Sequence, residues 1–398
     1  MTLSQMQSAL SLSKLPDCFP ELFSKIQNTW EARAAHILSK DYIYNTLTDC
    51  YALLPYRNAI CAAAEEAQKN PALCLFICLW EQWVAIGGTP YDPNYEPPAG
   101  EGVVYDLLHL FPLIPTMPDS VRFLRDRAVP EEIIAASLQE YDDSMETSIS
   151  QLGRPVFDKG RMGWLLVAIR NHIVRIDRFK YDLPDRFMEK VRVYENASGE
   201  QVILADGISV HRSGRVLGSI SFEDPEGSFF AGITETEDTV TGYPTMREYV
   251  QNTPVTLSKA DWTLRLTCND PVVRIHIPRK EPFDPEVVEA SYEKARAFFA
   301  RHFPDYPYKA FFCNSWLMSQ DLPAILKPTS NILAFQKKFT IVPSVSVGRA
   351  VFSFVFQRSA AVIPATFDDL PQTTSLERAI VQVYKNGGYI HEGSGFFF

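Results

Sequence analysis

Residues Val272–Trp316 read VVRIHIPRKEPFDPEVVEASYEKARAFFARHFPDYPYKAFFCNSW and predict a strand, a helix and a second strand. The β-branched run 272–277 is typical of a strand, the apolar spacing over 284–304 is typical of a helix, and 310–312 is again strand-like. Two strands joined by one helix should be parallel, with a right-handed crossover. Ligands of such units bind beyond the carboxyl ends of the strands. This edge should hold Pro278, Arg279, Lys280, Cys313, Ser315 and Trp316.

Composition places the chain among folded proteins and limits its partners. The 398 residues suggest two or three domains, and 46% hydrophobic residues suffice for a sizeable core. The net charge of −10 argues against nucleic acid or an anionic membrane as a partner. The start of the chain lacks the pattern of a signal peptide, and the most apolar window, 72–86, is too short to span a bilayer. We therefore expect a cytoplasmic protein.

The seven cysteines favour free thiols in a reducing compartment over a disulfide framework, because their number is odd and most lie in apolar helical sequence. Cys74 and Cys78 share a helical face, as two metal ligands could. No matching Cys or His pair lies nearby in the sequence. Core packing is therefore the better interpretation, and we expect no metal.

The chain changes character near Gly153. Residues 1–152 have helical spacing with few strand signals, so they predict a helical domain. Strands alternate with helices over 153–398, beginning with a hairpin that turns at 197–199. We expect two domains with this boundary.

Further along, the sequence predicts a helical stretch at 322–338 that is broken at Pro328. Two strands should follow at 339–347 and 351–356, with Gly348 at their turn. A short helix at 375–384 should precede the glycine-rich tail.

Short segments spread over nearly the whole chain carry a family resemblance. They are LADGISVHRSG (204–214), GYP (242–244), DPVVRIHIP (270–278), FFARHFP (298–304), FFCNSWLM (311–318), SNILAF (330–335) and TSLERA (374–379). With these segments the chain resembles bacterial proteins that pair a helical N-acyltransferase amino-terminal domain with a GNAT-like carboxy-terminal domain. The resemblance implies an α+β fold, a helical domain followed by a GNAT-like mixed β-sheet domain flanked by helices. It also implies an N-acyltransferase that uses acyl-CoA as co-substrate and a small-molecule amine as acceptor.

The turn that should hold the coenzyme departs from the GNAT pattern. GNAT enzymes grip the pyrophosphate with a basic, glycine-rich turn, since glycine lets backbone amides approach the phosphates. Here the turn 279–284 has no glycine, and Pro282 lacks an amide donor. An N-capping Asp284 would occupy further donors. The resemblance leaves these cofactor-binding candidates: Ile277, Arg279, Lys280 and Asn331. Because the turn is unusual, a non-catalytic small-molecule binding protein on the same scaffold stays open.

Three residues are candidates for the catalytic step. His276 could act as general base, because the imidazole titrates near neutral pH, or it could be a buried histidine bonded to backbone. Glu289 could bind or deprotonate an amine, or it could simply favour the helix dipole. Cys313 could carry the acyl group, or act in a Cys–His hydrolase, if His276 on the neighbouring strand lay within reach; otherwise it packs in the sheet.

Two residues at the end of the second strand are candidates for substrate binding. Ser315 shares a face of that strand with Cys313, and the Trp316 ring could stack on a ligand. Core packing is the alternative for the tryptophan. The helical domain should wall the acceptor pocket, and the negative charge of the protein mildly favours cationic amines.

Overall fold

The computed structural model describes residues 1–170, 172–183, 186–279, 281, 283–358 and 362–398. These residues form two compact units, 1–175 and 176–398, which are described separately. The predicted boundary at 152/153 falls inside the first unit, between two of its helices.

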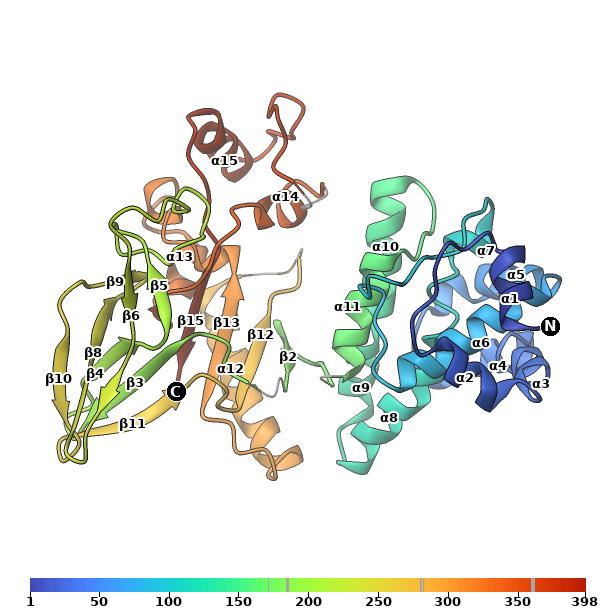
Figure 1. Cartoon of the computed structure of the whole chain (residues 1–398), viewed down its shortest axis with the longest axis horizontal. Helices are drawn as coiled ribbons and strands as arrows, with labels where there is room; N and C mark the ends of the chain where they lie inside the picture. Colours follow the sequence, from blue (N-terminus) through green and yellow to red (C-terminus); the bar gives the residue numbers. More distant parts are fainter. Residues whose placement is uncertain (171, 184–185, 280, 282, 359–361) are drawn as a thin grey trace. The chain divides into compact units, whose positions relative to one another are not determined.

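The first unit is built from helices, as Figure 1 shows in blue to green. They are α1 (Leu3–Ala9), α2 (Phe19–Ile26), α3 (Trp30–Ile37), α4 (Lys40–Asp49), α5 (Arg57–Gln68), α6 (Pro71–Ala85), α7 (Val103–Asp106), α8 (Met117–Asp126), α9 (Glu131–Leu138), α10 (Glu140–Leu152) and α11 (Lys159–Arg170). Helix α6 lies at the centre and contacts α1, α2, α3 and α5. Twelve of its 15 residues are buried, and its sequence is apolar except for Glu81 and Gln82, which suits a helix in the core.

The cysteines of α6 pack in this core. Cys74 and Cys78 are buried, and their thiols donate to the carbonyl oxygens of Ala67 and Trp30, each at 3.5 Å. All seven cysteines of the chain are free. In the described ranges, no group of three or more His, Cys, Asp or Glu residues is arranged to hold a metal ion. No described helix is long and apolar enough to cross a membrane.

The second unit has a mixed sheet in the order β1-β2-β12-β13-β15-β14, in which β1 lies at the boundary of the two units. Its strands are β1 (Val174–Ile176), β2 (Phe179–Asp182), β12 (Val272–His276), β13 (Ala310–Ser315), β14 (Thr340–Val342) and β15 (Gly393–Phe397). Strands β12 and β13 are parallel, which confirms the prediction, and α12 (Pro285–His302) connects them. The other neighbours with a described register are antiparallel.

A second sheet packs against this one. It has the order β10-β8-β4-β3-β11, with β7 and β9 also paired to β8, and a small β5–β6 pair lies beside it. Its strands are β3 (Val191–Asn196), β4 (Gln201–Ala205), β7 (Thr234–Glu235), β8 (Thr239–Met246), β9 (Tyr249–Val250), β10 (Val255–Ser258) and β11 (Trp262–Thr267), and the small pair is β5 (Ile208–Val210) and β6 (Phe229–Ala231). The predicted hairpin is β3–β4. One buried cluster joins Val191 and Val193 of β3 to Val272, Phe312 and Phe396 of the first sheet.

The carboxyl ends of β12 and β13 meet a group of short helices. These are α13 (Asn331–Gln336), α14 (Ala350–Phe354) and α15 (Ser375–Lys385), with the 3-10 turns Trp316–Met318 and Leu322–Ala324. In Figure 1 they gather beyond the tip of the β13 arrow. The predicted helix at 375–384 is confirmed as α15, whereas the stretch at 322–338 is helical only in part.

One predicted strand is wrong, and another is confirmed over only part of its length. Residues 351–356 were expected as a strand, but the helix α14 lies there. The other predicted strand, 339–347, is shortened to β14, which Pro343 follows directly, and proline cannot donate to a ladder. The tail, for which no strand was predicted, supplies β15 between β13 and β14. A Cβ on Gly393 would lie 2.6 Å from the carbonyl oxygen of Met318, so glycine is needed at this position.

Candidate active site

The two central strands stop pairing before they end. Strand β12 pairs with β13 only through Val272–Ala310, Val273–Phe311 and Arg274–Phe312 among the described residues. Beyond this point β12 pairs with β2, while β13 stays paired with β15 as far as Ser315. The facing edges of the two strands are therefore not joined to each other at their carboxyl ends, where a ligand of a βαβ unit binds.

His276 lies at this end of β12 and contacts a buried carboxylate. Its Nε2 is 3.1 Å from Oδ2 of Asp182 on β2, and the Asp182 side chain is 0% exposed while that of His276 is 21% exposed. Strand register places Asp182 opposite Arg274 and His276 opposite Lys180. Because side chains alternate along a strand, all four lie on one face of the sheet.

The polar row continues across the same face. Asn314 on β13 donates from Nδ2 to Oγ of Ser394 on β15 at 2.7 Å. Ser394 in turn donates to Oε1 of Glu189 at 2.6 Å. Burial raises the pKa of Glu189, although the Ser394 hydroxyl and the charge of Arg274 work against this shift. This face of the sheet thus changes from apolar, at Phe312 and Val272, to polar at the carboxyl ends.

Cys313 lies on the opposite face of the sheet. Register pairs Arg274 with Phe312, so Arg274 and His276 share the face of Phe312 and Asn314, and Cys313 points to the other side. Its side chain is buried, and burial raises the pKa of the thiol to about 12. The predicted Cys–His pair does not form, because a one-residue offset in a strand reverses the face. The alternative interpretation, that Cys313 packs in the sheet, therefore agrees with the structure.

Glu289 is engaged in an ion pair on α12. Its Oε1 lies 2.6 Å from Nζ of Lys338, and about half of the Glu289 side chain is exposed. The ammonium of Lys338 also lies over the rings of Tyr292 and Phe397. Glu289 is therefore held at the surface of the helix by a cation.

The turn between β12 and α12 has an arrangement that the sequence did not predict. Asp284 occupies the N-cap position of α12, yet its side chain makes no capping hydrogen bond. Its Oδ1 instead accepts a bond from Nδ2 of Asn331 at 3.2 Å, while Ser330 caps α13. The expectation that Asp284 would occupy the amides at the start of α12 is wrong, because Asn331 competes for its carboxylate.

Two charged residues of the turn, Arg279 and Glu281, contact different parts of the second unit. Arg279 donates to the carbonyl oxygen of Ser353 and stacks over the ring of Phe354, and burial lowers its pKa. Glu281 lies 4.0 Å from the guanidinium of Arg178, so its negative charge has a cationic neighbour. The cofactor-binding candidate Lys280 and the proline at 282 lie outside the described residues.

The remaining candidates lie around an apolar cluster beyond the strand ends. Trp316 is buried in this cluster with residues of α14 and α15, and Ile277 packs against it. The Ser315 hydroxyl accepts the backbone N–H of Leu317 and so caps the turn that follows β13. Ile277, Ser315 and Trp316 therefore lie at the predicted edge, with Trp316 in a packing role.

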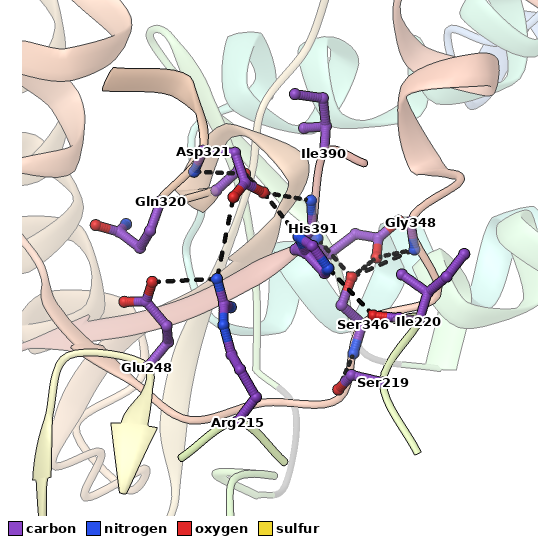
Figure 2. Close-up of polar contacts among 12 residues, drawn as sticks. Arg215, Ser219, Ile220, Glu248, Gln320, Asp321, Ser346, Gly348, Ile390 and His391 are labelled. Carbon is purple, nitrogen blue, oxygen red and sulfur yellow. Dashed lines mark hydrogen bonds and ion pairs between the residues drawn. The ribbon is translucent and has the colours of Figure 1, made fainter. Parts of the chain in front are cut away.

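A second histidine–aspartate pair lies at the same edge and was not predicted (Figure 2). Nδ1 of His391 is 2.9 Å from Oδ2 of Asp321, and its Nε2 is 3.2 Å from the carbonyl oxygen of Ile220. Arg215 lies between Asp321 and Glu248, at 4.0 and 3.3 Å from their carboxylates. Burial opposes the charge of Asp321, but the hydrogen bonds and charge of His391, aided by Arg215, keep the pKa of this carboxyl below its ordinary value. His391 and Asp321 are 70 positions apart in the sequence, so no local spacing predicts that they pair.

The neighbouring Glu392 explains the helix that replaced a predicted strand. Its carboxylate accepts the backbone N–H groups of residues 347–350 at 2.7–2.9 Å, and the Ser346 hydroxyl as well. Burial opposes the charge of Glu392, but these bonds hold its pKa below the ordinary value. A helix leaves its first amides without intrahelical acceptors, and Glu392 supplies an acceptor at the start of α14.

Comparison with known proteins gives a family for this architecture. No curated protein matches the chain. Three solved structures are similar over 100% of this chain and 99% of theirs: an acyltransferase mutant in complex with octanoyl-CoA (17% identity, TM-score 0.62), an acyltransferase in complex with decanoyl-CoA and teicoplanin (17%, 0.61), and an acyltransferase in complex with decanoyl-CoA (18%, 0.60). At this identity the likeness establishes the fold. Residues 173–397, more than half of the chain, match the family described as GNAT-like C-terminal domain. The chain therefore belongs to the family of proteins with a GNAT-like C-terminal domain.

Proposed function

We propose that this protein is an N-acyltransferase that transfers an acyl group from acyl-CoA to a small-molecule amine. The observation that carries the proposal is the loss of pairing between β12 and β13 at their carboxyl ends, beside the start of α12. The thioester would lie between the two strands, where strand backbone can polarise its carbonyl group. The similar acyltransferases with octanoyl-CoA and decanoyl-CoA support this class of donor.

The start of α12 is the proposed site for the pyrophosphate of the coenzyme. An 18-residue helix carries positive partial charge at its amino terminus. Asp284 does not cap these amides with its side chain, because the carboxylate bonds to Asn331. The missing glycines in the turn are therefore less of an obstacle than the sequence suggested. Asn331 would hold Asp284 aside, a positioning role, and Ile277 would lie next to the pantetheine arm.

His276 is the proposed general base. The neutral amine attacks the thioester carbon, a C–N bond forms, and the C–S bond breaks. The amine proton passes to His276 and the coenzyme leaves as a thiol after taking up a proton. Glu289 is a weaker candidate because Lys338 pairs with it, and Cys313 is weaker because burial keeps it a neutral thiol.

The helical unit would be the N-acyltransferase amino-terminal domain that the resemblance implies. The acceptor class stays broad: one similar acyltransferase was solved with teicoplanin, and the net charge of −10 favours cationic amines. The free thiols support a reducing, cytoplasmic setting.

Donor binding is the first test of this function. Thermal unfolding and calorimetric titration would use acetyl-CoA, octanoyl-CoA, decanoyl-CoA and free CoA. A donor at 100 times its dissociation constant should add about 2.7 kcal/mol to the free energy of unfolding. The donor that binds would then be incubated with a panel of primary amines, and amide products would be identified by mass spectrometry. Binding of no acyl-CoA would contradict the proposal, and binding without amide formation would favour a non-catalytic binding protein.

A further inference from the structure

We propose that Asp182 is the positioning residue of the site and fixes the proton of the neutral His276 ring on Nε2, so that Nδ1 is the atom that accepts the amine proton. This inference rests on the proposed function, and it assigns a role to a residue that no sequence pattern indicated. Asp182 ends β2, and His276 ends the neighbouring strand β12.

The geometry gives the hydrogen bond a defined direction. Oδ2 of Asp182 lies 3.1 Å from Nε2 of His276. An ionised carboxylate only accepts hydrogen bonds, so the ring must donate from Nε2. A neutral imidazole carries one proton, and its other nitrogen then has a lone pair. Asp182 thereby selects Nδ1 as the basic atom.

Basic side chains lie on the same face of the sheet as Asp182, which is fully buried. Register places Arg274 directly opposite it on β12, and Lys180 lies two residues before it on the same face. Glu189, the other carboxyl on this face, accepts from Ser394. Asp182 thus has one basic residue on its own strand, Lys180, and another directly opposite on β12, Arg274.

The same arrangement stabilises the imidazolium of His276 that proton transfer would form. When Nδ1 takes the amine proton, the ring becomes an imidazolium that keeps its Nε2–H bond to Asp182. The negative charge of Asp182 then faces the new positive charge at hydrogen-bond distance. Such a charge-assisted bond is about twice as strong as a neutral one. Asp182 therefore acts on the rate through His276, without contact to the substrate.

Asp182→Asn is the direct test, because it keeps the shape and removes the charge. The amide can donate to Nε2, which favours the ring form with its proton on Nδ1 and leaves no lone pair there. We expect kcat to fall by roughly 10²-fold or more, with KM for the amine and the acyl-CoA affinity changed less than about threefold. Asp177→Asn, which alters a carboxylate paired with Lys294 on the surface, is the matched control and should keep kcat.

A second measurement does not depend on turnover. In protein with ¹⁵N-labelled histidine, assigned by the loss of one signal in His276→Gln, the ring of His276 should carry its proton on Nε2. In Asp182→Asn the proton should move to Nδ1 or be shared. A wild-type ring protonated on Nδ1 overturns the inference, even if Asp182→Asn does not fold. An unchanged kcat in folded Asp182→Asn also overturns it, while acyl-CoA binding and amide formation by the wild type would leave the proposed function standing.

Discussion

Two histidines at the carboxyl ends of the central strands pair with a carboxylate, but through different ring nitrogens, Nδ1 in His391 and Nε2 in His276. His391 contacts acceptors at both nitrogens, Asp321 at Nδ1 and the carbonyl oxygen of Ile220 at Nε2. Both ring nitrogens of His391 therefore have oxygen partners within the protein. In the His276 pair, Asp182 requires a proton on one nitrogen only. The first ring is equipped to hold structure together and the second to accept a proton.

The charges around the two pairs agree with this division. Arg215 contacts Asp321 and Glu248, and His391 contacts Asp321 and Ile220, so these contacts tie the loop at residues 215–220 to the tail (Figure 2). Removing one member of a buried ion pair leaves the other charge without its partner, which lowers the free energy of unfolding. The His276 pair lies instead beside the strand edges that no longer pair, where a ligand could approach.

The largest expected difference between the pairs is in activity. His276→Gln should lower kcat by roughly 10²–10⁴-fold, because it removes the general base, whereas His391→Gln should change kcat by less than about threefold. Steady-state turnover of the acyl-CoA donor with the best amine measures both. Cys313→Ala serves as the control and should keep most of its activity, as expected for a buried neutral thiol. Equal losses of kcat in His276→Gln and His391→Gln would show that the two histidines do not differ in their roles.

The next effect concerns stability and should have the opposite pattern. Asp321→Ala removes the acceptor of the side chain and backbone N–H of His391 and of the Ser319 hydroxyl. We expect the free energy of unfolding to fall by about 3 kcal/mol in urea titrations. The control Asp368→Ala breaks an exposed ion pair with Lys385 and should cost at most about 1 kcal/mol. A loss no larger than that of the control would show that the network is not structural.

Acid should reduce the stabilising effect of Asp321. Its pKa in the folded protein lies below the ordinary 3.8, so its ionised form stabilises the fold at every pH above that ordinary value. The contribution decreases as the pH falls through the folded-state pKa. The difference in unfolding free energy between wild type and Asp321→Ala should therefore shrink as the pH falls below about 4. If this difference in unfolding free energy grew as the pH was lowered, the prediction would be contradicted.

The smallest effect tests whether the neighbouring Glu392 belongs to the same structural unit. Ser346→Ala removes one of the donors to Glu392 and an acceptor for its backbone N–H. Because four backbone amides remain bound to the carboxylate, we expect a loss of about 1–2 kcal/mol in the free energy of unfolding. Ser353→Ala, at a half-buried serine within α14, provides the comparison and should be close to neutral, because among the described residues its hydroxyl makes only a 3.3 Å bond to the carbonyl oxygen of Arg358. Chemical denaturation of the two variants side by side would measure the difference.

The candidate site was predictable in part. The ends of β12 and β13 were identified from the pattern of strand, helix and strand, and His276 was a candidate from its place in the strand. Asp182 was not, because it reaches His276 through antiparallel pairing with a strand about 90 residues earlier in the chain. His391 and Asp321 were not predicted for the same reason, because they are 70 positions apart in the sequence.

The sequence by itself determined the elements whose signals are local, such as the helices of the first unit, the β3–β4 hairpin and the unit of β12, α12 and β13. Periodicity, capping residues and turn residues act between near neighbours, so they can be read without a partner. Tertiary structure decided the rest. The tail became a central strand because Gly393 and Gly395 admit close neighbours, and residues 350–354 became helical where Glu392 accepts their first amides. Register placed His276 and Cys313 on opposite faces, since each strand obtains its hydrogen-bond partners from distant parts of the chain.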